Sequence, residues 1–205
     1  MSDFITQLAN QQVIPVITLD QPELALPLAE ALLAGGMSIL EITLRTPNSQ
    51  FVLKELAADK RFTIGAGSIN SITQLTTAVK AGAKFLVSPG SYKPLLQAAL
   101  ETKLPYLPGV STASEILLNL NLGVEVVKFF PAKNLGGPAG LKTICAPFPT
   151  MRFMPTGGIT AADFSDYLQL PNVVAVGGSW MVSSELIAAQ NWTQITKLAS
   201  LRDSR

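Results

Sequence analysis

Short apolar runs recur along the chain at a nearly constant interval, and this repeat restricts the possible folds more than any other feature of the sequence. The runs are rich in Val, Ile and Phe, and their first residues lie between 20 and 26 positions apart. Such an interval accommodates one strand, one helix and two short connections. We therefore expect eight strands, near residues 13–18, 39–43, 63–66, 85–88, 105–108, 126–130, 152–155 and 173–177.

Helix signals fill the intervals between these runs. Leucines repeat every four residues from Leu24 to Leu32, and the pair Gly35-Gly36 then predicts the end of that helix. Thr112-Ala-Ser-Glu115 has the pattern of a capping box, and Thr160-Ala-Ala-Asp163 is its acidic equivalent. Each pattern precedes apolar residues and predicts the start of a helix.

The eight strand–helix units indicate one domain, because no change of composition and no Pro/Ser-rich linker interrupts them. We expect a single (β/α)8 TIM barrel over residues 1–205, with extra helices near residues 3–11 and 191–201. An open doubly wound α/β sheet is the alternative. A barrel would place reactive side chains at the carboxyl ends of the strands, facing inward.

Several common types of site are excluded by missing residues. The chain has no histidine, which excludes a Ser-His-Asp triad, a Cys-His pair and an HExxH zinc site. The single cysteine, Cys145, excludes an intrachain disulfide and a thiolate metal cluster. Acid–base chemistry would therefore depend on a carboxylate, a lysine or water.

The distribution of charge and hydropathy predicts no nucleic-acid or membrane partner. Fifteen basic and fourteen acidic residues are scattered along the chain and give a net charge of +1. No segment is long and apolar enough to span a membrane. The first residues, MSDFITQLANQQ, lack the basic cluster of a targeting signal, so a cytoplasmic location is expected.

Two charged residues lie within apolar strands. Lys128 is in the run VEVVKFFP, where burial of an ammonium group is costly unless it is paired or neutral, and Arg is the better residue for a purely structural buried pair. Glu41 lies mid-strand, and alternation places it on one face with Thr43 and Arg45. We expect this face to point inward. Lys84 begins its strand and is expected at the solvated rim.

Glycine-rich turns follow the seventh and eighth expected strands, at residues 155–160 and 176–180. Glycines at these positions of a barrel, beside a helix N-terminus, can bring backbone N–H groups close to a phosphate. A third turn, at residues 64–68, places the Ser68 hydroxyl at the end of the third strand. These turns predict a phosphorylated ligand.

A lysine among apolar groups and near an arginine is suited to nucleophilic catalysis, since desolvation and a neighbouring cation both favour a neutral amine. Lys128 would form a Schiff base with a ketone, and the protonated imine would accept electrons from a breaking carbon–carbon bond. Glu41 would relay protons. Arg45 and Ser68 would bind the carboxylate of a 2-oxo acid.

The chain resembles a known family, the bacterial 2-keto-3-deoxy-6-phosphogluconate (KDPG) aldolases, also called 4-hydroxy-2-oxoglutarate (KHG) aldolases. The resemblance extends from about Val13 to Trp180. It is carried by the ordered segments GGMSILEITLRT, IGAGS, FLVSPG, LPGVST, VVKFFPA, FMPTGGI and VAVGGSW.

The resemblance implies a class I aldolase that needs no metal or other cofactor, forms homotrimers and acts in the Entner–Doudoroff pathway. Its expected substrate is a phosphorylated 2-oxo acid, KDPG, which is cleaved to pyruvate and glyceraldehyde 3-phosphate; KHG would give pyruvate and glyoxylate. By resemblance, Lys128 is the Schiff-base lysine and Glu41 the general acid/base. The implied substrate-binding residues are Arg45, Ser68 and Thr156 at the pyruvate end, and Gly157, Gly158, Gly178 and Ser179 at the phosphate.

The chain departs from the family pattern at Ser68, where Thr is usual, and at Lys133, where Glu is usual. Ser68 keeps the hydroxyl, whereas Lys133 reverses a charge near the expected mouth of the site. The alternatives are an aldolase for the galactonate epimer, a barrel phosphosugar isomerase or decarboxylase with Glu41 as base, and a non-catalytic sensor of sugar phosphates.

Overall fold

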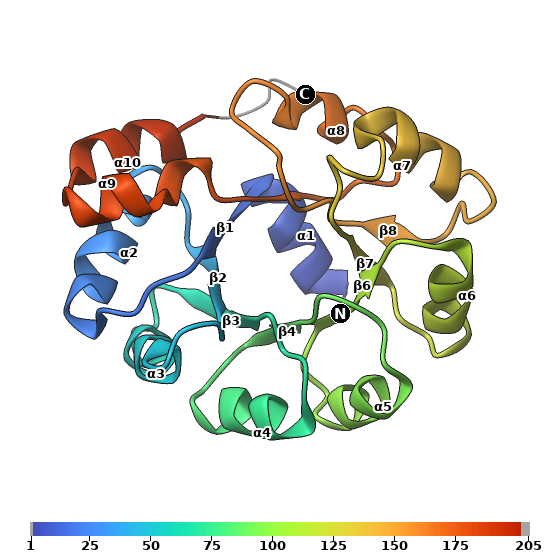
Figure 1. The fold of residues 1–205 in the computed structure, drawn as a ribbon, viewed down its shortest axis with the longest axis horizontal. Helices are drawn as coiled ribbons and strands as arrows, with labels where there is room; N and C mark the ends of the chain where they lie inside the picture. Colours follow the sequence, from blue (N-terminus) through green and yellow to red (C-terminus); the bar gives the residue numbers. More distant parts are fainter. Residues whose placement is uncertain (1, 202–205) are drawn as a thin grey trace.

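The computed structural model describes residues 2–201 and shows an α/β fold in which helices surround a central set of parallel strands (Figure 1). The strands are β1 Val13–Ile17, β2 Ile39–Thr43, β3 Thr63–Gly67, β4 Phe85–Val87, β5 Tyr106–Leu107, β6 Gly109–Val110, β7 Val126–Phe129, β8 Arg152–Phe153 and β9 Val176–Gly178. The helices are α1 Ser2–Gln11, α2 Ala25–Ala34, α3 Ser49–Ala58, α4 Ile72–Lys80, α5 Lys93–Glu101, α6 Ala113–Asn121, α7 Gly137–Cys145, α8 Phe164–Leu168, α9 Ser184–Ala188 and α10 Trp192–Ala199, with 3-10 helices η1 Pro22–Leu24 and η2 Trp180–Val182.

The strands form two parallel sheets. The larger has the order β5-β4-β3-β2-β1-β9 and forms half of a barrel, and the smaller has the order β6-β7-β8. Within the larger sheet β1 to β5 follow one another in sequence, without the reversal of strand order that defines a doubly wound sheet. The expectation of one continuous strand at 105–108 is wrong, because Pro108 separates β5 from β6 and has no N–H to donate to a ladder.

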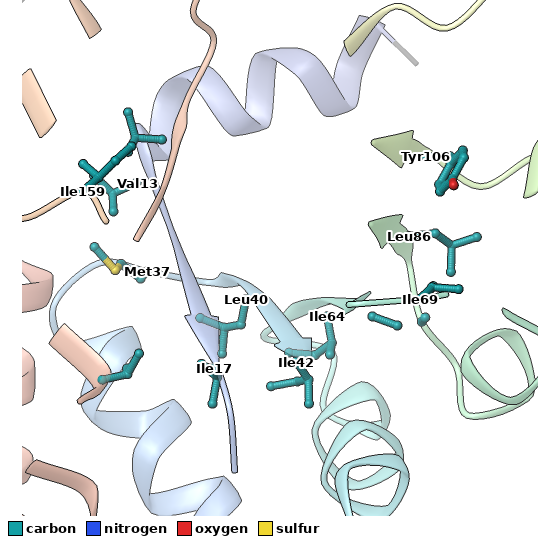
Figure 2. Close-up of a cluster of buried hydrophobic side chains, with 14 of the residues drawn as sticks. Val13, Ile17, Met37, Leu40, Ile42, Ile64, Ile69, Leu86, Tyr106 and Ile159 are labelled. Atoms are coloured by element: carbon teal, nitrogen blue, oxygen red, sulfur yellow. The ribbon is translucent and has the colours of Figure 1, made fainter. Parts of the chain in front are cut away.

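Strand β2 shows the predicted alternation. Leu40 and Ile42 are fully buried in the layer between the sheet and the helices, where Figure 2 shows them near Ile17 of β1 and Ile64 of β3. Glu41 and Thr43 point to the opposite, inner side and are also fully buried. The outer layer accounts for most of the apolar core, and it fixes which face of β2 carries the polar groups.

Helix α1 closes one end of the strand assembly. Its Phe4 and Leu8 belong to the inner core cluster, with the Phe4 ring centroid 5.1 Å from that of Phe85. The buried amide of Gln11 donates to the carbonyls of Val13 and Ile39 and accepts from the Ile39 N–H. These bonds fix the end of α1 against the first residues of β1 and β2, so the opposite, carboxyl ends of the strands carry the open face.

Most sequence-predicted boundaries agree with the structure. The helix that ends at Gly35 and the terminal helices are confirmed, and Thr112 and Glu115 form the capping box of α6. Lys84 is exposed, as expected. The second capping prediction is wrong: α8 begins only at Phe164, and the Asp163 carboxylate instead accepts hydrogen bonds from the Thr160 N–H and hydroxyl.

The helices within residues 2–201 include none with the length and apolar character required to cross a membrane.

Candidate active site

A buried ion pair joins the two charged residues that the sequence places inside apolar strands. Lys128 Nζ lies 3.2 Å from Glu41 Oε1, and the two residues are 3% and 0% exposed. Glu41 comes from β2 in the larger sheet and Lys128 from β7 in the smaller one. Desolvation of two charges is costly, and their contact offsets part of that cost. The amine therefore has a proton acceptor within hydrogen-bond distance.

The carboxylate of Glu41 has only one of its oxygens engaged. Oε1 accepts from Lys128, whereas Oε2 is buried and has no hydrogen-bond partner within residues 2–201. An unpaired carboxylate oxygen in a buried position is costly. It can accept a hydrogen bond from a water or from a hydroxyl of a bound molecule, so the arrangement can transfer a proton as well as hold a charge.

Gly67, at the end of β3, provides the space that the Glu41 carboxylate occupies. Gly67 pairs with Thr43 of β2, and Glu41 lies two residues earlier on that same neighbouring strand. A Cβ at Gly67 would overlap Glu41 Oε1 and lie 2.7 Å from both Cγ and Cδ of that side chain. Sequence analysis did not identify this role. The only signal was the GAG turn itself, which does not reveal what lies across from it.

Lys128 lines a cavity of about 110 Å³, whose walls come from β1, β7 and β9 and from the segments that follow β2, β7, β8 and β9. The Phe130 ring lies beside the amine, with Nζ 5.6 Å from the ring centroid. Thr156 is buried in the wall. The lining residues are Val16, Arg45, Lys128, Phe130, Thr156, Gly157, Gly158, Ile159, Gly177, Gly178 and Ser179.

Arg45 and Ser68 are brought together as predicted, but not against the lysine. Arg45 Nε donates to Ser68 Oγ at 2.7 Å, and Arg45 is exposed where it lines the cavity. Ser68 has a positive φ of 58°, a conformation that few residues other than glycine adopt. It does not line the cavity itself and reaches it through Arg45. The charge in contact with Lys128 is the Glu41 carboxylate rather than the guanidinium.

The two glycine-rich turns line the same cavity. Gly157 and Gly158 have φ values of 102° and 74°, where a side chain would be strained. Gly178 and Ser179 also belong to the lining. The expected helix N-terminus directly beside Gly158 is absent from the described part of the chain, because α8 starts at Phe164, six residues farther on. Anion binding here would depend on the turns themselves.

Four lining residues were not predicted from the sequence: Val16, Phe130, Ile159 and Gly177. Apolar residues in strands and turns carry no signal that separates a cavity wall from the core. Gly177 is the partial exception, because a Cβ there would overlap the Thr156 side chain, and the double glycine in VGG is visible in the sequence.

The charges of the cavity favour an anionic ligand. The ionisable lining residues are Arg45 and Lys128, and the adjacent carboxylate of Glu41 is paired with the lysine. A nucleophilic amine, a carboxylate in contact with it, a guanidinium and two glycine turns therefore surround one space. This set suits addition of an amine to the carbonyl of an acidic substrate, followed by proton transfer.

Comparisons with known proteins agree with this chemistry. The family description "Aldolase: KDPG and KHG aldolase" matches residues 4–198. The "KHG/KDPG aldolase" of Escherichia coli K12 is 43% identical over 193 residues, which cover 94% of this chain and 91% of that protein. The "2-dehydro-3-deoxy-phosphogluconate aldolase" of Pseudomonas aeruginosa is 43% identical over 189 residues, covering 92% and 86% of the two chains.

Two solved structures are also similar. A KDPG aldolase from Legionella pneumophila, with pyruvate captured as a covalent carbinolamine, has a TM-score of 0.92 at 44% identity and covers 96% of each chain. The corresponding aldolase of Zymomonas mobilis, with 3-phosphoglycerate, has a TM-score of 0.88 at 40% identity and covers 97% of this chain and 92% of that one.

Proposed function

Because the chain belongs to the KDPG and KHG aldolase family, we propose that Lys128 and Glu41 carry out its carbon–carbon bond cleavage. The protein is a class I aldolase that splits KDPG into pyruvate and glyceraldehyde 3-phosphate in the Entner–Doudoroff pathway. The observation that carries the residue assignment is the buried contact between an amine and a carboxylate at the cavity.

In the proposed reaction, Glu41 takes one proton from Lys128 across their 3.2 Å contact and leaves a neutral amine. The amine adds to the C2 carbonyl carbon of KDPG, and one proton passes from the nitrogen to the new alkoxide, directly or through water, to give a neutral carbinolamine. Glu41 then gives the proton to the carbinolamine hydroxyl, which leaves as water, and a protonated imine remains. This step restores the carboxylate for the next proton transfer.

Cleavage follows when the Glu41 carboxylate removes the proton of the C4 hydroxyl, directly or through water. The C3–C4 bond breaks, its electron pair neutralises the iminium to form an enamine, and glyceraldehyde 3-phosphate leaves. Glu41 returns the proton to C3, and water hydrolyses the resulting imine to release pyruvate and regenerate Lys128. The free Oε2 atom supports this role, since it can accept the hydroxyl proton while Oε1 stays near the amine.

The two ends of the cavity bind the two ends of the substrate in this proposal. Arg45, held by Ser68, binds the carboxylate next to C2, and the wall residue Thr156 is assigned to the same end of the substrate. The phosphate-binding residues are Gly157, Gly158, Gly178 and Ser179. The 3-phosphoglycerate in the Zymomonas structure is a phosphorylated three-carbon acid, and it supports a phosphate site in this family.

We extend the proposal to KHG, because the name of the E. coli relative includes that substrate. Cleavage at the same bond would give pyruvate and glyoxylate.

The fold that we propose for the full chain is a single (β/α)8 barrel domain over residues 1–205, of which 1 and 202–205 lie outside the described residues. Pro108 alone separates β5 from β6, and parallel bridges pair Phe153 with Val173 and Thr156 with Gly177 near β8 and β9. These contacts support closure of the two sheets into one barrel. We further propose a homotrimer, and a cytoplasmic location, since a phosphorylated sugar acid does not cross a lipid membrane unaided.

Borohydride reduction in the presence of pyruvate tests the residue assignment. One reduced pyruvate unit should attach to Lys128, detected by mass spectrometry of the digested protein. Lys128→Arg should lose KDPG cleavage by more than about a thousandfold, because a guanidinium does not form the imine. Lys84→Arg, at an exposed strand start, is the matched control. It should acquire the reduced pyruvate unit on Lys128 and cleave KDPG as the wild type does.

An unmodified Lys128 with full aldolase activity would contradict the assignment. Substantial turnover of a phosphosugar by Lys128→Arg would instead favour an isomerase or decarboxylase that uses Glu41 as base.

A further inference from the structure

Lys133 lies directly against the glycine turn at the proposed phosphate end of the cavity. It follows β7 in the chain, and its N–H donates to the Gly157 carbonyl at 3.0 Å. The preceding N–H, of Ala132, donates to the Thr156 carbonyl at 2.8 Å. Two backbone bonds thus fix the segment after β7 to the turn after β8, and the position of Lys133 does not depend on its own side chain.

The stem of Lys133 covers Gly158. A Cβ placed on Gly158 would lie 2.8 Å from Lys133 Cβ, 3.0 Å from Cδ and 3.4 Å from Cγ. The lysine side chain therefore runs along the glycine rather than away from it. Its ammonium group, one methylene beyond Cδ, stays within a Debye length of the turn, about 8 Å at physiological salt.

The Lys133 ammonium is available to a ligand. Lys133 is exposed, and none of the ion pairs formed within residues 2–201 includes it. The charged residues that line the cavity have other roles in the proposed function: Lys128 contacts Glu41, and Arg45, held by Ser68, is assigned to the substrate carboxylate. Asp163, the acidic residue of the same turn region, bonds to Thr160.

We propose that Lys133 is a specificity-determining residue that selects substrates with a charged distal phosphate over the same carbon chain without it. The proposal rests on the assignment of Gly157 and Gly158 to the phosphate. Backbone groups of these turns supply position, and Lys133 supplies the positive charge that they lack. At a separation of several ångströms in solvent, one such charge changes the binding of a dianion by about three- to tenfold.

The test compares KDPG with 2-keto-3-deoxygluconate, which differs only in lacking the phosphate. For Lys133→Gln, kcat/KM for KDPG should fall about three- to tenfold, mainly through KM, and Lys133→Glu should fall by more than tenfold. Cleavage of 2-keto-3-deoxygluconate by both variants should stay within twofold of the wild type. Added salt should lower kcat/KM for KDPG less in Lys133→Gln than in the wild type.

Lys142→Gln is the matched control, because it removes the same charge from an exposed lysine within α7, whereas Lys133 is fixed to the glycine turn by its N–H bond to Gly157 and by its contact with Gly158. Its kinetics with both substrates should match the wild type. An equal loss on both substrates would overturn the proposal by showing a structural role, and so would an unchanged KM for KDPG in Lys133→Glu. A wild type that cleaves neither substrate would instead contradict the proposed function.

Discussion

At the scale of single residues, the candidate site depends on a missing side chain as much as on the charged ones. The Glu41 carboxylate is 0% exposed and lies where a Cβ of residue 67 would be. A Cβ at residue 67 would force the carboxylate to shift from its place beside Lys128. Gly67 has no side chain, so the Glu41 carboxylate can occupy that space and stay in contact with Lys128.

Gly67→Ala should displace the Glu41 carboxylate and lower kcat for KDPG cleavage about 10- to 100-fold, with a smaller change in KM. Glu41→Asp lacks the terminal atoms that a methyl group at residue 67 would overlap most closely, but it keeps Cγ, which would lie 2.7 Å from that methyl group. In the Glu41→Asp background, Gly67→Ala should therefore cost less than it does beside Glu41. Steady-state kinetics of the four proteins measure this coupling.

Gly65→Ala, two residues earlier in β3, is the control for Gly67→Ala. Its Cβ would meet the Phe85 ring instead of the Glu41 carboxylate, so it should lower stability and leave the pH profile of kcat unchanged. If Gly67→Ala costs the same with Glu41 and with Asp at position 41, the positioning role is wrong.

The sequence predicted the charged residues of the site and not the small ones. Lys128 and Glu41 stand out because a charge in an apolar strand requires a reason. Gly67 and Phe130 are ordinary in such strands. Their roles depend on which atoms lie opposite them in space, and a linear pattern does not contain that information.

At the scale of elements, the two capping patterns have different outcomes. Glu115 Oε2 accepts hydrogen bonds from the N–H groups and hydroxyls of Ser111 and Thr112 at the start of α6. Asp163 forms a similar contact with Thr160, but the three residues after Thr160 form a turn and α8 is only five residues long. The capping contact is thus predictable from sequence in both cases, whereas the residue at which the helix begins and the length of that helix depend on packing.

The capping box should make stability depend on pH. Burial alone would raise the pKa of Glu115, but the hydrogen bonds from Ser111 and Thr112 outweigh it and lower the pKa below its ordinary value. A carboxyl with a lower pKa in the folded state stabilises the protein above the unfolded pKa of about 4.3, and that contribution disappears as pH falls through the folded pKa. Glu115→Gln should therefore lower the free energy of unfolding by about 0.5–1 kcal/mol at pH 7.

Chemical denaturation of wild type and Glu115→Gln at pH 7 and below pH 4 measures this contribution. The difference between the two proteins should shrink as pH falls, whereas Glu101→Gln, an exposed change at the end of α5, should show no such trend. A difference that is the same at both pH values would show that the charge of Glu115 makes no contribution.

At the scale of the whole molecule, the outer helices expose apolar side chains. Phe51 on α3 is 54% exposed, Ile72 and Val79 on α4 are 50% and 38% exposed, and Tyr92 before α5 is 62% exposed. These four residues form the α3–α5 face, on consecutive helices at the rim of the fold (Figure 1). Exposed apolar residues on adjacent elements are typical of surfaces that bind another protein, and we assign this face to the proposed homotrimer.

Charged substitutions on the α3–α5 face should dissociate the trimer without unfolding the subunit. Phe51→Lys combined with Ile72→Lys should sediment as a monomer at micromolar concentration and keep a native circular dichroism spectrum. Leu117→Lys, on α6 at 48% exposure, is the control and should remain a trimer. A wild-type monomer, or dissociation of the Leu117→Lys control instead, would contradict this assignment.

The overall architecture was largely predictable because each unit repeats the same lengths of strand and helix. What the sequence did not predict was continuity: Pro108 divides one expected strand, and the run at 173–177 pairs as β9 only from Val176. Pairing depends on the hydrogen bonds that neighbouring strands can offer, and a run of apolar residues predicts a strand without predicting its partners.

The Glu41–Lys128 contact joins residues 87 positions apart, from two different sheets. During synthesis the carboxylate leaves the ribosome first, and the amine can meet it only after both sheets have come together. A chain cut between Glu41 and Lys128 still contains both side chains, but they are not in contact and the chain is inactive. Turnover is therefore a direct reporter of completed folding, and two inactive fragments divided between β5 and β7 would become active only by reassembling.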